Sequence, residues 1–535
     1  MATLTYHRKP NGTTYVYRQE SYWDKDKKRS GTHQVCIGKL GTDGEIIYNK
    51  RFSNPAALEA LEKGETISES LITGQSLVLV KAARSSGLLG VLTNTLGQDM
   101  ADRLISLAYS VVALGGKMYY APVWMEENEC PARGMHITSP EISRILASVS
   151  QSGIEDFLSA WMKYRNKATH EQYCFDITSV SSYNMTNPFV EYGYNRNKEK
   201  LAQINIALLS GAKSKIPTYY EILPSSMSDV KTIGSFVEHM KKYGIARIRM
   251  LLDCGFYSAL NLGLLLKEKM GFFIPAPANI SSTQTLIDTY RDALEMPEYI
   301  ISLSEDNRDA IYGMTVLSKM EGKRVWQHIY YDTARRTEHV LSLFANLATW
   351  EEELRSEELK EANQWAYERY FKVKTTPKRG LRITRIQEAV NAYKTDRAGY
   401  WVIITNCEKD AKAALLAYRE RSRVESHFDD LKNELDMARL RTHNSDTMRG
   451  RVLVQFLALV VTSQTRVILD DAWERRREFP KEVRLSRHYS LSELMFRLGS
   501  YRSTRFSGRY GEVVSTPTKA QREIFTAFGI DVQHT

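Results

Sequence analysis

Three acidic side chains occupy positions where a carboxylate is costly without a partner. Asp176 lies inside the apolar segment YCFDITSV, and Asp253 ends the apolar segment RIRMLLD. Glu425 lies in AYRERSRVESHFDDLK, which has helical spacing. A carboxylate within or at the end of a buried strand is unfavourable unless it is paired or binds a metal ion. Because Mg²⁺ and Mn²⁺ prefer oxygen ligands, the three residues are candidate ligands for such ions.

Further polar residues accompany Glu425 at regular spacing. Tyr418, Arg421 and Lys432 complete a set at offsets of 0, 3, 7 and 14, which a regular α-helix would place in one stripe about 60° wide. A phenol, two cations and a carboxylate on one face suit a phosphate-rich ligand, because the cations neutralise phosphate and a metal ion offsets the carboxylate's repulsion. Two ions about 4 Å apart serve phosphodiester cleavage and transfer well. The pattern predicts a metal-dependent site for such chemistry.

Each residue also has an ordinary structural explanation. Arg421 and Glu425 are spaced as an i, i+4 ion pair on a solvated helix face. Asp253 lies two residues before Gly255, and Asp close to Gly is a frequent loop-capping signal. Asp176 can be a core carboxylate with a paired cation. The functional interpretation therefore depends on all three acidic positions taken together.

The three segments resemble the catalytic blocks of the DDE transposases of bacterial insertion sequences, specifically those with the YREK signature, often called insertion-sequence family four and its relatives. The pattern Y-x2-R-x3-E-x6-K is complete from Tyr418 to Lys432. D-x-T-S at Asp176–Ser179 and D-x-G-F at Asp253–Phe256 precede it in the expected order. The resemblance covers about residues 171–461. It implies a ribonuclease-H-like domain in which the three acidic residues are catalytic and bind two Mg²⁺ or Mn²⁺ ions per active site.

The resemblance also implies an activity and its partners. It implies cut-and-paste transposition, in which strand cleavage at the transposon end forms a DNA hairpin that is reopened and joined to target DNA. The partners would be double-stranded DNA, as terminal inverted repeats and as target, and a second copy of the chain in a synaptic homodimer. Two alternatives stay open: another ribonuclease-H-like nuclease or recombinase, and a non-catalytic DNA-binding protein descended from a transposase.

DNA contacts near the cut follow from the same resemblance. Tyr418, Arg421 and Lys432 would contact phosphates, and a tryptophan in or near the insertion would stack on a base flipped out of the duplex. Trp401, in the segment YWVII, is the candidate, because aromatic rings stack on unpaired bases. The alternative is an aromatic residue packed within a sheet, since strands favour Trp.

Basic residues form further candidate contacts. Lys378 and Arg379 lie in KVKTTPKRGLRITR, and Arg439 and Arg441 follow the glutamate segment. Such clusters track phosphate without reading sequence, although any one of them can be ordinary solvated surface. The chain's net charge of +10 favours a polyanionic partner.

The composition also limits which other classes of protein the chain can belong to. The longest apolar run, Val452–Val461, is interrupted by Gln455 and is shorter than the roughly 20 residues of a membrane span, so no membrane partner is expected. The five cysteines are scattered without a C-x-x-C pair, which is typical of reduced thiols. We expect a cytoplasmic protein of a bacterium or archaeon that is nucleoid-associated when bound to DNA.

The alternation of strands and helices from about residue 171 predicts an α/β core. It would be a ribonuclease-H-like mixed sheet with a mainly β insertion, preceded by a β-then-helical DNA-binding region and followed by a helical C-terminal region. The expected regions are 1–70, a small antiparallel sheet; 71–166, helical and a candidate end-DNA-binding region, with a helix-turn-helix-like unit near 139–161; 167–278, the first part of the catalytic domain; 279–408, the insertion; 409–475, the rest of the catalytic domain, with the glutamate helix; and 476–535, basic.

Overall fold

The structure is a computed structural model that divides into two compact units. The first comprises residues 1–154, 431–437 and 446–535, and the second comprises residues 155–430 and 438–445. The described residues are 3–10, 12–24, 29–42, 44–49, 67–169, 171–184, 187–193, 200–227, 229–245, 247–303, 309–376, 380–442, 444–507 and 511–532.

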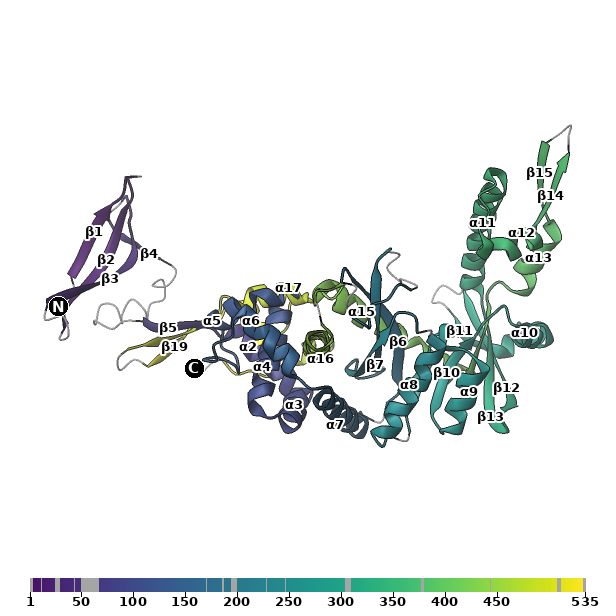
Figure 1. Cartoon of the computed structure of the whole chain (residues 1–535), viewed down its shortest axis with the longest axis horizontal. Helices are drawn as coiled ribbons and strands as arrows, with labels where there is room; N and C mark the ends of the chain where they lie inside the picture. The colour runs from purple at the N-terminus through teal and green to yellow at the C-terminus, as the bar shows by residue number, and fades with distance from the viewer. Residues whose placement is uncertain are drawn as a thin grey trace. The chain divides into compact units, whose positions relative to one another are not determined.

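The second unit is built on a ten-stranded mixed sheet (Figure 1). Nine strands follow one another across it, and the short β17 (Arg439–Leu440) pairs with β6 beside this path. In sheet order the nine are β11 (Ile300–Leu303), β12 (Ala310–Met320), β13 (Lys323–Asp332), β16 (Tyr400–Thr405), β10 (Gly271–Ala276), β9 (Arg249–Leu251), β6 (Tyr173–Ser182), β7 (Ala202–Gly211) and β8 (Pro217–Pro224).

Five strands form the part of the sheet that carries Asp176. β6, β7 and β8 pair antiparallel in sequence order, whereas β9 lies parallel to β6 and β10 lies parallel to β9. Parallel neighbours need a crossover, and the helices α8 (Asp229–Lys242) and α9 (Ala259–Lys267) lie in the two connections. These strands and helices confirm the alternating pattern predicted for residues 167–278.

β6 and β7 are covered on both faces. Every residue of β7 is buried, and Asp176 is the one residue of β6 that is not. Phe175 contributes to this burial through ring contacts with Phe236 of α8 and with Phe256, at centroid distances of 4.9 Å and 5.4 Å. A continuous apolar strand is what a sheet covered on both faces requires, so the partial exposure of Asp176 is a local exception.

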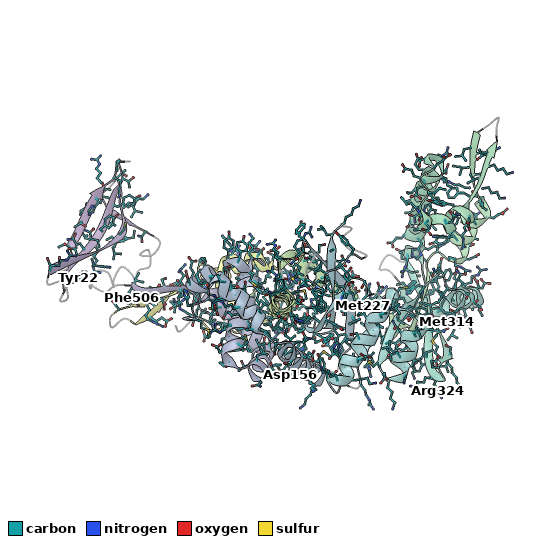
Figure 2. The ribbon with its side chains drawn as sticks, viewed as in Figure 1. Tyr22, Asp156, Met227, Met314, Arg324 and Phe506 are labelled. Carbon is teal, nitrogen blue, oxygen red and sulfur yellow. The ribbon has the colours of Figure 1, made fainter. Side chains whose placement is uncertain are left out.

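Residues 279–408 extend this sheet. β16 pairs antiparallel with β10, β13 pairs antiparallel with β16, and β12 and β11 follow. Met314 on β12 and Arg324 on β13 are labelled in Figure 2. The expected mainly β composition of this segment is wrong, because it also contains four α-helices. They are α10 (Ser281–Leu294), α11 (Thr333–Ser356), α12 (Gln364–Tyr370) and α13 (Gln387–Asp396).

α11, α12 and α13 pack with a β-hairpin around a core of their own. The hairpin is β14 (Phe371–Thr376) with β15 (Gly380–Arg385), and the core includes Leu347, Trp350 and Tyr370. The charged segment at residues 350–368 is not one continuous helix, because Glu357 adopts a left-handed conformation with φ of 58° and ends α11. A left-handed residue is a common way to terminate a helix.

The first unit begins with a four-stranded antiparallel sheet. Its strands are β1 (Thr3–Arg8), β2 (Thr14–Asp24), β3 (Arg29–Leu40) and β4 (Ile46–Tyr48). Helices follow, as the spacing predicted. They are α2 (Gly74–Ser85), α3 (Leu88–Leu96), α4 (Gln98–Ala113), α5 (Ala121–Glu127), α6 (Ser139–Ser148) and α7 (Gln151–Thr169), the last of which continues into the second unit.

The C-terminal region adds helices and strands. α17 (Leu491–Leu498) and α18 (Lys519–Ala527) confirm helices there, but β18 (Arg502–Phe506) pairs with β5 (Ile67–Ile72) and with β19 (Glu512–Val514). The C-terminal region therefore contains the expected helices together with strands that were not expected. The partner of β18 lies more than 400 residues away in the chain, so the sequence gives no local signal for this pairing.

The 30-residue helix α16 (Ser445–Glu474) carries the longest apolar run. By length and composition it is long enough to cross a membrane, but 78% of its apolar window is buried inside the protein, as in the core helix of a globular fold. Gly450 packs against α6, where an added Cβ would meet the carbonyl oxygen of Leu146. The sequence-based division placed α16 with the catalytic region, whereas residues 446–474 group with the first unit.

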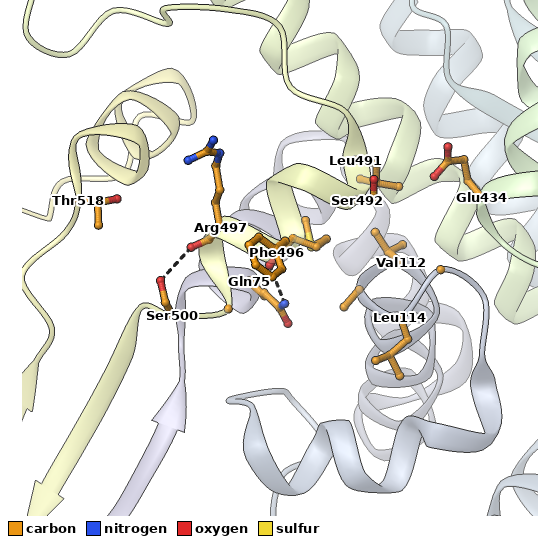
Figure 3. A pocket seen from close by; sticks show the side chains of 14 residues that line it. Gln75, Val112, Leu114, Glu434, Leu491, Ser492, Phe496, Arg497, Ser500 and Thr518 are labelled. Carbon is orange, nitrogen blue, oxygen red and sulfur yellow. Dashed lines mark hydrogen bonds between the residues drawn. The ribbon is translucent and has the colours of Figure 1, made fainter. Parts of the chain in front are cut away.

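The first unit also contains a cavity of about 800 Å³ (Figure 3). Gln75 helps to order its wall, because its Nε2 donates to the Met495 carbonyl oxygen at 2.9 Å while its Oε1 accepts from Trp124 Nε1. Val112, Leu114 and Phe496 contribute apolar surface. The lining is thus mainly apolar, and two hydrogen bonds hold the Gln75 side chain in place.

Candidate active site

Asp176 sits on a rigid central strand. Its backbone pairs with Leu208 of β7, and its Oδ1 accepts a hydrogen bond from its neighbour Ile177 N at 2.8 Å. The side chain is 17% exposed. Because β6 is buried at its other nine positions, the strand fixes where this carboxylate points.

Asp253 follows β9 and precedes the short helix η2 (Cys254–Phe256). Its Oδ1 accepts from Cys254 N at 2.7 Å, so the loop-capping explanation considered for this residue is observed. The side chain is nevertheless 48% exposed, which leaves oxygen lone pairs available. Phe256 packs on Phe175, and this contact ties the segment that follows Asp253 to the strand that carries Asp176.

Glu425 is brought to the same place by a break between two helices. α14 (Ala411–Arg419) ends before α15 (Ser422–Asp429) begins, and the turn between them contains i→i−3 hydrogen bonds such as Arg421 N to Tyr418 O. Cys174 Sγ donates to the Glu420 carbonyl oxygen at 3.3 Å and fastens the turn to β6. The single regular helix assumed for the 60° stripe is therefore wrong, because a tight turn interrupts its period.

The turn places Arg421 among the three carboxylates. Its Nη1 lies 3.4 Å from Asp176 Oδ2. Its Nη2 lies 3.1 Å from Glu425 Oε1 and 3.9 Å from Asp253 Oδ1. The i, i+4 pair with Glu425 thus exists, but it belongs to a cluster in which one cation serves three anions.

The electrostatics of the cluster follow from this crowding. Burial alone would lower the pKa of Arg421, but the nearby Tyr418 and the three carboxylates more than offset it, so this pKa is raised. Burial also raises the pKa of the Tyr418 phenol, which lies near both Arg421 and Asp253. Arg421 therefore stays charged and Tyr418 stays neutral across the physiological pH range.

The three carboxylates supply oxygen donors of the kind that hard divalent ions prefer. In the part of the chain that the structure describes, no group of three or more His, Cys, Asp or Glu side chains is arranged to hold a metal ion. The contacting oxygens of Asp253 and Glu425 share Nη2, so they are at most about 7.0 Å apart, the total of the 3.1 Å and 3.9 Å distances. Two ions about 4 Å apart with oxygen ligands at about 2.1 Å span roughly 8 Å between opposite ligands. Three carboxylates at this spacing suit such a pair once Arg421 turns away.

The other residues of the signature lie on the same chain segment. Tyr418 is on α14, and Lys432 is half-buried in the π-helical turn η5 (Asp430–Glu434). π-Helical turns change the helical repeat and are frequent at functional sites. The 100° rule used on the sequence therefore does not hold through this turn.

Trp401 packs within the sheet. Its ring stacks on Tyr330 of β13 at 5.1 Å, and the Arg335 guanidinium lies 4.7 Å from its centroid. The alternative weighed for this residue, an aromatic packed between strands, describes its present contacts. It remains half-buried, and its predicted base-stacking role is a separate question.

The predicted basic contacts are distributed over two places. Lys378 and Arg379 lie outside the described residues, but the strands on either side of them, β14 and β15, bring Lys374 directly opposite Arg382. Arg441 is exposed, and Arg439 of β17 lies over the exposed Tyr183 ring at 5.8 Å. β17 pairs with β6 at Ser181, about 17 Å along the strand from Asp176 by the rise per residue.

Sequence reasoning assigned Arg421 to phosphate and weighed its i, i+4 pair with Glu425, but it missed the ion pairs with Asp176 and Asp253. It also missed Cys174, which holds the turn before α15. The spacing signal for Cys174 was present, since it lies two residues before Asp176 on a strand and so on the same face. Nothing local indicated that its partner would be the Glu420 carbonyl oxygen.

Comparison with known proteins places the chain. A search of curated proteins found no match. A cryo-EM structure of the piggyBac transposase synaptic complex with hairpin DNA is similar at 10% sequence identity and a TM-score of 0.34, over 79% of this chain and 70% of that one. This likeness is too distant to transfer any contact. The model of the family described as "Transposase DDE domain" matches residues 167–461, more than half of the 535 residues. The chain, with its three clustered carboxylates inside that match, belongs to the transposase DDE domain family.

Proposed function

We propose that this chain is a transposase that cuts and joins DNA at transposon ends, with Asp176, Asp253 and Glu425 holding two Mg²⁺ or Mn²⁺ ions. The observation that carries the proposal is the convergence of the three carboxylates on Arg421, within the residues that the family match covers. When bound, such ions supply an activated oxygen nucleophile and stabilise the leaving oxygen.

The residues of the site have distinct tasks in this proposal. Asp176 is the fixed metal ligand because its strand is buried. Asp253 and Glu425 are about half-exposed or more, so they can bind metal ions that enter from solvent. Asp253 and Glu425 share the single Nη2 atom of Arg421, and two carboxylates this close favour the uptake of a cation. Arg421, released from the carboxylates, would then bind a phosphate oxygen beside the cut, a task that suits its planar fork of donors.

We infer that the core is ribonuclease-H-like and that the chain belongs to the YREK group. The support is the strand order β8-β7-β6-β9-β10, with three antiparallel strands followed by two parallel ones. Asp176 lies on the central strand of this set and Asp253 just beyond the adjacent one. The complete Tyr418-to-Lys432 signature supports the group.

The β14–β15 hairpin supports DNA as the substrate. Residues 371–385 contain six Lys or Arg and no Asp or Glu. Lys374 and Arg382 face each other across the strands, and like charges at directly opposed positions are destabilising unless an anion lies between them. We assign Lys378 and Arg379, with this pair, to the DNA backbone. Trp401 could stack on a flipped base only after leaving Tyr330.

The remaining steps rest on the resemblance alone. Cut-and-paste movement through a DNA hairpin, and a homodimer that holds two ends together, are proposed on that basis. A denaturing gel that detects a hairpin on the flanking or the transposon side tests the first. The mass of the protein with two end duplexes bound tests the second.

The central experiment is cleavage of a duplex that carries the element's end. We expect strand cleavage with Mg²⁺ or Mn²⁺ and none with EDTA. Asp253→Asn and Glu425→Gln should each reduce the rate by roughly 10²–10³-fold or more, because each removes charge that stabilises the transition state.

A matched control is Glu238→Gln on α8, an exposed carboxylate of the same unit. It should cleave at the wild-type rate. Wild-type cleavage that persists in EDTA, or equal losses in Glu238→Gln and Glu425→Gln, would contradict the metal-binding assignment. Binding without any cleavage would favour the non-catalytic alternative.

A further inference from the structure

The N-terminal sheet has two faces of different character. On one face Val16 and Ile37 are buried, and Leu40, Ile46 and Ile67 pack against them. The other face, which we call the open face, is defined by strand register, with His7 opposite Tyr15, Gln19 opposite Gln34, and Tyr15 opposite Lys39. Among the described strand residues, none on the open face is Asp or Glu.

The open face is a patterned polar surface. The Tyr17 ring meets His7 edge-on at 4.9 Å, and Gln34 Nε2 donates to Gln19 Oε1 at 2.6 Å on the exposed surface. A hollow of about 530 Å³ lies on the same face, lined by Lys9, Pro10, Tyr15, Tyr17 and Cys36. Side-chain amides, a cation and two phenols therefore meet on one side of four strands.

Charge points to the kind of partner. Residues 1–52 contain ten Lys or Arg and five Asp or Glu, which leaves +5 of the chain's net +10 in about a tenth of its length. Such a concentration favours a polyanion. The open face carries cations and no described carboxylate, so it is the better complement to phosphate.

Shape favours a duplex. Among the described residues β1 pairs with β2 from Arg8 to Thr3, which lies opposite Gln19, and the partners recorded for Ser21 to Asp24 of β2 are on β3, with Ser21 opposite Thr32. β2 and β3 thus stay paired beyond Gln19, as far as Asp24 opposite Arg29. Tyr22 (labelled in Figure 2) alternates to the opposite face and covers Gly31. The major groove of B-DNA admits a two-stranded β-ribbon, and Gln side chains pair with adenine edges there.

We propose that the open face of the N-terminal sheet binds duplex DNA. Gln19 and Gln34 face the base edges, and Lys9 and Lys39 face the phosphates on either side. The inference rests on the proposed function, since a transposase has two duplex partners, the element's end and the target. It gives DNA binding to the sheet, in addition to the helices near residues 139–161 that sequence spacing suggested.

The test uses the full-length chain and fluorescence anisotropy in EDTA, so that binding is measured without cleavage. The probes are a duplex of the element's end, a scrambled duplex of equal length, and the corresponding single strand. Lys39→Glu should weaken duplex binding about tenfold near 0.15 M salt and reduce the slope of log affinity against log salt by about 1. Arg8→Glu is the matched control, because Arg8 is equally exposed on the same sheet but faces the other side.

The double variant Gln19→Ala/Gln34→Ala distinguishes the two duplexes. A larger loss on the end duplex assigns the open face to end recognition, and equal losses on both duplexes assign it to target DNA. Equal effects of Lys39→Glu and Arg8→Glu, or a loss confined to the single strand, would overturn the proposal. Circular dichroism and a thermal midpoint confirm that each variant is folded.

The outcome is separable from that of the proposed function. If wild-type protein cleaves the end duplex and Lys39→Glu binds DNA as tightly as wild type does, the open face is not a DNA-binding surface. The proposed transposase function would still stand. If DNA binding depends on Lys39 but the protein never cleaves with Mg²⁺, the catalytic assignment is wrong. The DNA-binding role of the open face would still stand.

Discussion

Two carboxylate clusters in the second unit are built from similar groups and are satisfied to very different degrees. Glu353, in the helical part of the insertion, accepts from Asn363 Nδ2 at 2.8 Å and from the Tyr367 hydroxyl at 2.7 Å, and it pairs with Lys360. At the candidate active site three carboxylates share Arg421.

The difference between the two clusters distinguishes a carboxylate that stabilises the fold from carboxylates that are available to bind a ligand. Glu353 is buried and its hydrogen bonds to Lys360, Tyr367 and Asn363 lower its pKa to about 2, so its charge is compensated where it stands. Asp253 and Glu425 keep 48% and 60% of their side chains exposed and share one cation. A satisfied carboxylate stabilises a fold, and a cluster with excess negative charge is available for a ligand.

The largest expected effect comes from neutralising one member of each cluster. Asp176→Asn should reduce Mg²⁺-dependent cleavage by roughly 10³-fold while changing the unfolding midpoint by less than about 2 °C, because it relieves repulsion at a crowded site. Glu353→Gln should lower the midpoint and leave the cleavage rate of the folded protein within about twofold, since it lies in a separate core. Cleavage rates paired with calorimetry check both, and a reversed pattern would break the comparison.

A smaller effect is expected for the shared cation. Arg421→Met leaves the three carboxylates unbalanced, so the metal-free protein should be less stable, and Mn²⁺ should raise its midpoint more than it raises that of wild type. The physical basis is linkage, since an ion that binds the folded state stabilises it. The measurement is a thermal titration with Mn²⁺, and Lys360→Met beside Glu353 is the control that should show no added metal response.

A change of pH should also distinguish the two clusters, through a smaller change in the unfolding midpoint. The pKa of Glu353 is about 2 in the folded protein and near its ordinary value of about 4.3 when unfolded. Its contribution to stability is therefore present above the unfolded pKa and is lost as pH falls through the folded one. The measurement is the unfolding midpoint between about pH 5 and pH 2.5, a range that covers most of the interval between the two pKa values. Over this range the midpoint should fall more in wild type than in Glu353→Gln. Equal slopes would show that the carboxylate is not coupled to folding.

The smallest effect concerns Trp401. Trp401→Phe should keep the stacking on Tyr330 and change cleavage by no more than about threefold, whereas Trp401→Ala should slow steps that need an unpaired base, since base stacking contributes about 1–3 kcal/mol. A duplex with a mismatched or abasic nucleotide at the cut should restore part of the rate in Trp401→Ala. Equal stability losses with no rescue would assign this residue to packing alone.

Much of the catalytic core could be predicted from local pattern. Apolar runs of strand length around Asp176 and before Asp253, alternating with amphipathic helices, gave the elements of residues 167–278. The mixed composition of the insertion was missed, because α11 begins at Thr333 with no strong apolar stripe to separate it from the preceding strand. The strand β18 was missed because its partner β5 is remote in sequence.

The sequence by itself determined which side chains are proposed to carry the chemistry, since residue type and spacing do not depend on how the rest of the chain folds. Only the tertiary structure decided that Arg421 stands among the carboxylates, because this depends on a turn that breaks the expected helix and on a thiol of β6 that holds it. Helical periodicity is a local property, whereas the meeting of residues 176, 253 and 425 is set by sheet order and by long-range contacts that no local window contains.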